Sequence, residues 1–123
     1  MINLYKKQDD SRLCTGLSLE EFKCRCSHHT CRMTMVNQEF IVAYERLRSL
    51  LNRPLKINSG FRCAYHNYQV GGVACSFHQT GRAIDISKKT IDYLSDADFE
   101  HAAKQSGFTF VKAYSTFYHC DVR

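Results

Sequence analysis

Three side chains, His78, Asp85 and His119, are of the types that bind zinc in a catalytic site. Imidazole nitrogens and carboxylate oxygens are suitable zinc donors, and a set of two histidines and one carboxylate leaves one coordination position open for water. An open position distinguishes a catalytic zinc from a structural one. The chemistry that such a metal supports is hydrolysis, because it polarises a carbonyl and lowers the pKa of water to about 7.

Two predicted strands would have to bring these donors together. In residues 82–87 apolar and polar side chains alternate, so that Asp85 faces away from the core. In residues 117–122 the same alternation places His119 and Asp121 on one face. Adjacent strands could therefore present a carboxylate, a histidine and a second carboxylate to one cleft. Spacing alone also allows the alternative that each histidine is structural.

The remaining elements indicate a mixed fold. Two capping-box patterns predict helix starts at Ser18–Glu21 and Ser95–Asp98, and apolar residues at helical spacing predict the main core helix over 37–51. Further strand patterns occupy 55–59 and 108–114. Helices and strands do not alternate regularly, so we expect an α+β domain. Its small, largely antiparallel sheet would pack against a few helices and hold zinc in a cleft on the sheet.

Length and composition fit one domain over residues 1–123, with 1–16 as an N-terminal segment. The chain has 44% hydrophobic and 24% charged residues, which is ordinary for a globular protein. No apolar run approaches the length of a membrane span, and the first residues lack the pattern of a signal peptide. The net charge of +5 favours anionic partners, but the basic residues are scattered. We therefore expect a monomer made in the cytoplasm that binds no nucleic acid.

Seven cysteines are the most unusual feature of the composition. Without an export signal, thiols or metal ligands are expected rather than disulfides. Cys24, Cys26 and Cys31, together with His28 or His29, could form a second, structural zinc site. The Cys-x-Cys spacing is tighter than the usual Cys-x-x-Cys, so reduced thiols are favoured over this site. Disulfides formed after release are the third alternative.

Three segments together resemble a known enzyme family. Residues 76–86, SFHQTGRAIDI, resemble the Ser-x-His-x-x-Gly-x-Ala-x-Asp motif of zinc D-Ala-D-Ala carboxypeptidases and related LAS-type peptidoglycan metallopeptidases. Residues 57–62, INSGFR, resemble the strand and Gly-aromatic-Arg that precede this motif in the family. Residues 117–123, FYHCDVR, resemble the ending of a compact branch found in phage lysins and small cell-wall peptidases. The resemblance covers about residues 17–123.

The resemblance implies a role for each matching residue. His78, Asp85 and His119 would bind one catalytic zinc ion. Arg62 would stabilise the oxyanion that forms as the scissile carbonyl becomes tetrahedral, and would contact substrate. Ser76 would help to orient the substrate or a zinc ligand.

One departure from the family concerns the general base. Many members carry a glutamate three residues before the second zinc histidine, where this chain has Thr116. Either Asp121 acts as the base, or the chain is a weak or inactive relative. Asp121 could instead orient a zinc-bound histidine.

The expected function is zinc-dependent hydrolysis of an amide bond in peptidoglycan stem peptides. The enzyme would be a D-Ala-D-Ala carboxypeptidase or a murein endopeptidase, such as a phage endolysin, and would reach the cell wall by release or lysis. The alternative is a catalytically weak or inactive zinc-containing module of the same fold that binds the wall. Turnover of purified murein distinguishes the two.

Overall fold

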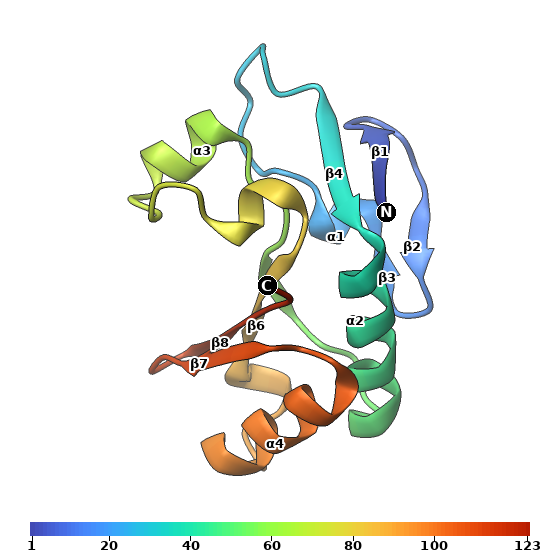
Figure 1. The fold of residues 1–123 in the computed structure, drawn as a ribbon, viewed down its shortest axis with the longest axis vertical. Helices are drawn as coiled ribbons and strands as arrows, with labels where there is room; N and C mark the ends of the chain where they lie inside the picture. Colours follow the sequence, from blue (N-terminus) through green and yellow to red (C-terminus); the bar gives the residue numbers. More distant parts are fainter.

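The computed structural model describes residues 1–123 and is an α+β fold, as expected (Figure 1). The strands are β1 (Ile2–Lys6), β2 (Arg12–Cys14), β3 (Leu17–Ser18), β4 (Met33–Asn37), β5 (Ile57–Ser59), β6 (Ala83–Ser87), β7 (Phe110–Ala113) and β8 (Phe117–Asp121). The helices are α1 (Leu19–Phe22), α2 (Gln38–Leu51), α3 (Ala64–Gln69) and α4 (Asp96–Ser106), with 3₁₀ helices η1 (Phe77–Thr80) and η2 (Lys88–Thr90). No helix has both the length and the apolar character that a membrane span requires.

The central sheet has four antiparallel strands in the order β5-β6-β8-β7. All four were predicted from alternating side chains, although β7 is shorter than the pattern over 108–114 indicated. Its core side is covered by α2 and α4, which contribute Phe40, Tyr44 and Phe99 to the buried cluster. Ile84 and Ile86 of β6 are fully buried in this cluster. Asp85 lies on the opposite face of β6 and is partly exposed.

The starts of α1 and α4 follow the predicted capping residues. Ser18 and Glu21 form the reciprocal capping box of α1, which ends after four residues, and Ser95 caps α4. Asn37 caps α2 by accepting hydrogen bonds from the backbone N–H groups of the first turn. These caps fix where each helix begins, and the spacing of the buried residues sets which face of α2 and α4 meets the core.

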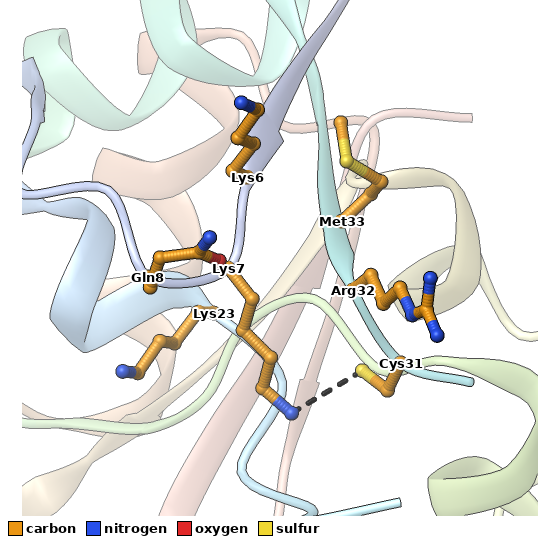
Figure 2. Close-up of a pocket in the computed structure, with 7 residues that line it drawn as sticks. All are labelled: Lys6, Lys7, Gln8, Lys23, Cys31, Arg32 and Met33. Carbon is orange, nitrogen blue, oxygen red and sulfur yellow. Dashed lines mark hydrogen bonds between the residues drawn. The ribbon is translucent and has the colours of Figure 1, made fainter. Parts of the chain in front are cut away.

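Two pairings outside the central sheet were not predicted. β1 pairs with β4 in an antiparallel register from Ile2↔Asn37 to Lys6↔Met33, and β2 pairs with β3. Where β1 ends and β4 begins, a cavity of about 560 Å³ is lined by Lys6, Lys7, Gln8, Lys23, Cys31, Arg32 and Met33 (Figure 2). The N-terminal segment is thus tied to the strand that leads into α2.

Gly81 is a position where the fold requires glycine. It ends η1 in the left-handed conformation, with φ 69°, and a Cβ there would collide with the backbone carbonyl of Met35. We expect Gly81→Ala to lower the free energy of unfolding by about 2–5 kcal/mol, because an unfavourable conformation and a steric clash add. Gly71 has φ 72° but no neighbour within 4 Å, so Gly71→Ala should cost only about 1–2 kcal/mol. If urea unfolding shows the same loss of unfolding free energy for Gly81→Ala and Gly71→Ala, the steric clash at position 81 is relieved by local movement.

Candidate metal centre

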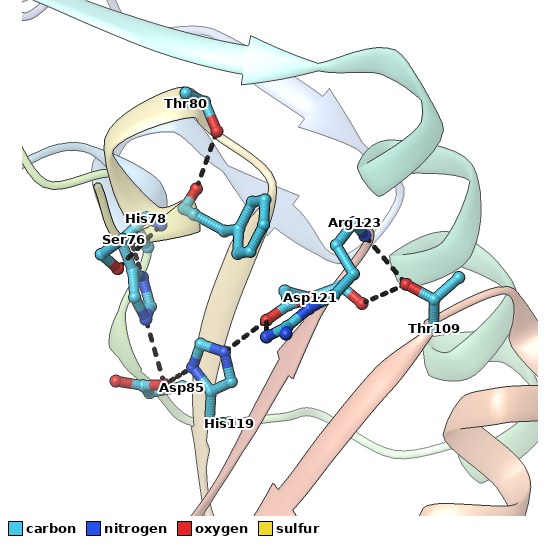
Figure 3. A network of polar contacts seen from close by, with 10 residues as sticks. Ser76, His78, Thr80, Asp85, Thr109, His119, Asp121 and Arg123 are labelled. Atoms are coloured by element: carbon cyan, nitrogen blue, oxygen red, sulfur yellow. Dashed lines mark hydrogen bonds and ion pairs between the residues drawn. The ribbon is translucent and has the colours of Figure 1, made fainter. Parts of the chain in front are cut away.

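The predicted donors lie together on three elements of the fold. Asp85 in β6 and His119 in β8 are direct cross-strand partners, so the register of these two strands sets their separation. His78 lies on η1, which precedes β6, and its side chain is fully buried. The donor atoms of these three residues all lie within 4.8 Å of one another. Figure 3 shows Asp85 between the two imidazole rings.

The donor distances fit a tetrahedral zinc site. Asp85 Oδ1 lies 3.2 Å from His78 Nε2 and 3.0 Å from His119 Nδ1. With zinc–donor bonds of about 2.1 Å, the donors of a tetrahedral site lie about 3.4 Å apart. Only small side-chain movements separate the present arrangement from that geometry.

Each histidine has a hydrogen-bond acceptor on the ring nitrogen that faces away from Asp85. His78 Nδ1 donates to the carbonyl oxygen of Gly60 at 2.7 Å, and His119 Nε2 donates to Asp121 Oδ2 at 2.8 Å. Such acceptors fix the ring orientation and the tautomer of a metal-binding histidine. His78 would therefore bind metal through Nε2, and His119 through Nδ1.

The electrostatics of the site suit a cation. Burial would raise the pKa of Asp85, but hydrogen bonds with His119 and His78 lower it to about 2. Burial would lower the pKa of His119, but hydrogen bonds with Asp121 and Asp85 raise it to about 9. This raised pKa favours a proton on His119 when no metal is bound. A zinc ion has to displace that proton in order to bind.

Asp121 contacts two side chains, His119 and Arg123. It is fully buried, and besides accepting from His119 it forms a two-pronged ion pair with Arg123, at 2.9 Å to Nε and 2.8 Å to Nη2. The Arg123 guanidinium lies over the Phe110 ring, 4.0 Å from its centre. Of the two roles that the sequence left open, these contacts favour orientation of His119. The role of Asp121 as general base stays a prediction.

Asp121→Asn distinguishes these roles. If Asp121 orients His119, the amide weakens this support and the ion pair with Arg123, and zinc affinity should fall about 10- to 100-fold. Competition with a chromogenic chelator measures this, with the exposed Asp92→Asn as the control. Unchanged zinc affinity together with lost hydrolysis would instead identify Asp121 as the base.

A cavity of about 580 Å³ opens beside the donors. Asp85 and His119 line it, together with Arg62, Val70, Gly71, Gly72, Val73, Ser76, Phe110, Lys112, Tyr114, Phe117 and Arg123. The three cations Arg62, Lys112 and Arg123 outnumber its one carboxylate, Asp85. The cavity is therefore suited to an anionic ligand of small-molecule size.

Arg62 and Ser76 line the same cavity as Asp85 and His119. The Nε of Arg62 is buried and has no hydrogen-bond partner within the chain. Burial lowers the pKa of Arg62, whereas the charge of Asp85 acts in the opposite direction. Ser76 caps η1 by accepting a hydrogen bond from the backbone N–H of His78 at 3.2 Å. Ser76 thus acts on the backbone that carries a metal donor.

Thr116 lies apart from this cavity. It is exposed in the turn between β7 and β8 and lines a different pocket with Ser87 and Lys88. No carboxylate other than Asp85 lines the cavity beside the donors. The position that holds glutamate in many relatives therefore supplies no base in this chain.

Comparison with known proteins identifies the family of the chain. A family model described as Peptidase M15 matches residues 15–121, which include the three donors, Arg62 and Ser76. The chain therefore belongs to the peptidase M15 family. This membership implies metallopeptidase activity on peptidoglycan-type substrates, and the peptidases of this family are zinc-dependent. No curated protein matches the chain.

Proposed function

We propose that the chain is a zinc-dependent peptidase that hydrolyses an amide bond in peptidoglycan stem peptides. The observation that carries this proposal is the cluster of His78, Asp85 and His119, of which Asp85 and His119 line a cationic cavity. When bound, zinc supplies a Lewis acid that polarises a carbonyl and activates water at neutral pH.

The remaining roles fall to groups of the protein itself. The Gly60 carbonyl and the Asp121 carboxylate orient the rings of His78 and His119. The lone pairs of the opposite ring nitrogens then point toward the metal position. Arg62 stabilises negative charge that develops on the scissile carbonyl oxygen, because it lines the same cavity as Asp85 and His119. Lys112 lies at the exposed edge of the cavity, where it can pair with a carboxylate of the substrate.

The charge of the cavity supports a stem peptide as substrate. Stem peptides carry free carboxylates, and the three cations around Asp85 complement them. A terminal carboxylate would be bound in a D-Ala-D-Ala carboxypeptidase, and an internal one in a murein endopeptidase. We expect the protein to reach its substrate in the cell wall by release or lysis.

A second candidate function is a wall-binding module with little or no activity. It is favoured by the absence of a second carboxylate from the cavity lining, which leaves no evident proton acceptor beside Asp85. Such a module would use the same cations to bind the stem peptide.

Digestion of purified peptidoglycan by the zinc-loaded protein tests the proposal. We expect soluble products, and mass spectrometry of the muropeptides would identify the bond. Release of D-alanine indicates a carboxypeptidase, and loss of crosslinks indicates an endopeptidase. Peptidoglycan that binds the protein but stays chemically unchanged would overturn the proposal in favour of the wall-binding module.

A further inference from the structure

A second group of potential metal ligands lies outside the cavity and is made only of cysteines. We call it the cysteine cluster, and its members are Cys24, Cys26, Cys31 and Cys63. Three of them come from the loop between α1 and β4, and Cys63 is the residue that caps α3. The sequence left His28 or His29 as the fourth ligand, whereas the structure brings in a thiol from 32 residues beyond Cys31.

The sulfur positions match a tetrahedron around zinc. Cys24 Sγ lies 3.6 Å from Cys26 Sγ and 3.7 Å from Cys63 Sγ, and the latter two are 3.6 Å apart. With zinc–sulfur bonds of about 2.3 Å, the edges of a tetrahedral site are about 3.8 Å long. These three sulfurs thus form one nearly equilateral face, and Cys31 Sγ lies within 4.8 Å of each.

Burial raises the pKa of Cys24 and Cys31, but specific contacts of the cysteine cluster stabilise negative charge on sulfur. Lys7 Nζ lies 3.3 Å from Cys31 Sγ (Figure 2). It also lies 3.7 Å from Cys26 Sγ. Backbone N–H groups also donate to sulfur, from Cys63 to Cys24 at 3.4 Å and from His66 to Cys63 at 3.3 Å. Four thiolates around Zn²⁺ carry a net charge of −2, which a nearby ammonium and amide donors offset.

Burial distinguishes the cysteine cluster from a chance surface grouping. Cys24 is 1% exposed and Cys31 is 7% exposed, while Cys26 and Cys63 are half-buried. All four are free thiols in the structure. The group therefore forms a largely enclosed site whose donors are all soft sulfur ligands, which favour zinc.

We propose that the cysteine cluster binds a second zinc ion, which is structural because protein ligands fill all four coordination positions. Binding releases the thiol protons and involves no oxidation. The ion would fasten the loop over 24–31 to the start of α3. Because Arg62 directly precedes Cys63, the same ion would hold the backbone from which Arg62 reaches the cavity.

The zinc content of His78→Ala tests this proposal separately from the catalytic site. With the His78 site disabled, we expect one zinc ion per chain, and a thiol-specific mercurial should release it to a chromogenic chelator. Cobalt in place of that zinc should give an intense thiolate-to-metal charge-transfer absorption. An absence of bound zinc, or zinc that the mercurial does not release, would overturn the proposal.

Cysteine variants of the full chain provide the matched comparison. Cys26→Ser should lose one zinc equivalent, whereas Cys75→Ser should lose none, because Cys75 is exposed and lies outside the cysteine cluster. If Cys26→Ser does not fold, the number of free thiols in the unmodified protein tests whether the four cysteines are available as zinc ligands. Two disulfides among the four cysteines, found by mass before and after reduction, would exclude the zinc site.

Discussion

Replacing His78 with alanine is expected to remove one zinc ion per chain and to abolish hydrolysis of peptidoglycan. His78 is fully buried and its Nε2 is one of the three donors, so the variant retains only Asp85 and His119 at this site. Two donors bind zinc far more weakly than three. Metal analysis after gel filtration measures the loss, and the activity should fall to that of zinc-free protein.

The exposed His101→Ala in α4 is the control for loss of a histidine, and its zinc content and activity should match the parent. Because alanine leaves a cavity at position 78, circular dichroism should confirm that the helices still form. Asp85→Asn, at a partly exposed position, provides a second variant with little change in volume. Full zinc content and activity in both site variants would contradict the donor assignment.

Arg62→Ala should have the second-largest effect, on turnover rather than on metal binding. If Arg62 stabilises the oxyanion, its contact strengthens in the transition state, so the alanine variant should lower kcat far more than it raises KM. Loss of one such donor costs about 100- to 1000-fold in kcat. Steady-state kinetics on a defined muropeptide measures both constants, at unchanged zinc content.

Arg62→Lys should recover only part of the rate, because a point charge does not reproduce the planar guanidinium. Arg46→Ala, on the exposed face of α2, is the control for loss of a positive charge. An unchanged kcat in Arg62→Ala would show that Arg62 is structural, even though its Nε lacks a partner in the free protein.

The elements that carry the donors were predictable because their signals are local. Alternation along β6 buries Ile84 and Ile86 and leaves Asp85 on the other face, and the structure has this arrangement. The capping box at Ser18 and the helical spacing after Asn37 likewise depend only on neighbouring residues. Such patterns locate strands and helices without knowledge of the tertiary fold.

Contacts between distant residues were not predictable in the same way. The β1–β4 pairing joins short strands whose apolar residues Ile2, Leu4 and Met33 are exposed, and its partners lie about thirty residues apart. Cys63 joins the other cysteines only because α3 begins beside the loop over 24–31. Spacing in the sequence determines neither of these.

The position of the catalytic zinc is tested most directly by anomalous diffraction at the zinc edge, from crystals of the zinc-loaded protein. We expect a peak enclosed by His78 Nε2, Asp85 Oδ1 and His119 Nδ1, at the wall of the cationic cavity. A zinc-loaded crystal with no peak at these donors would contradict the assignment of the metal centre.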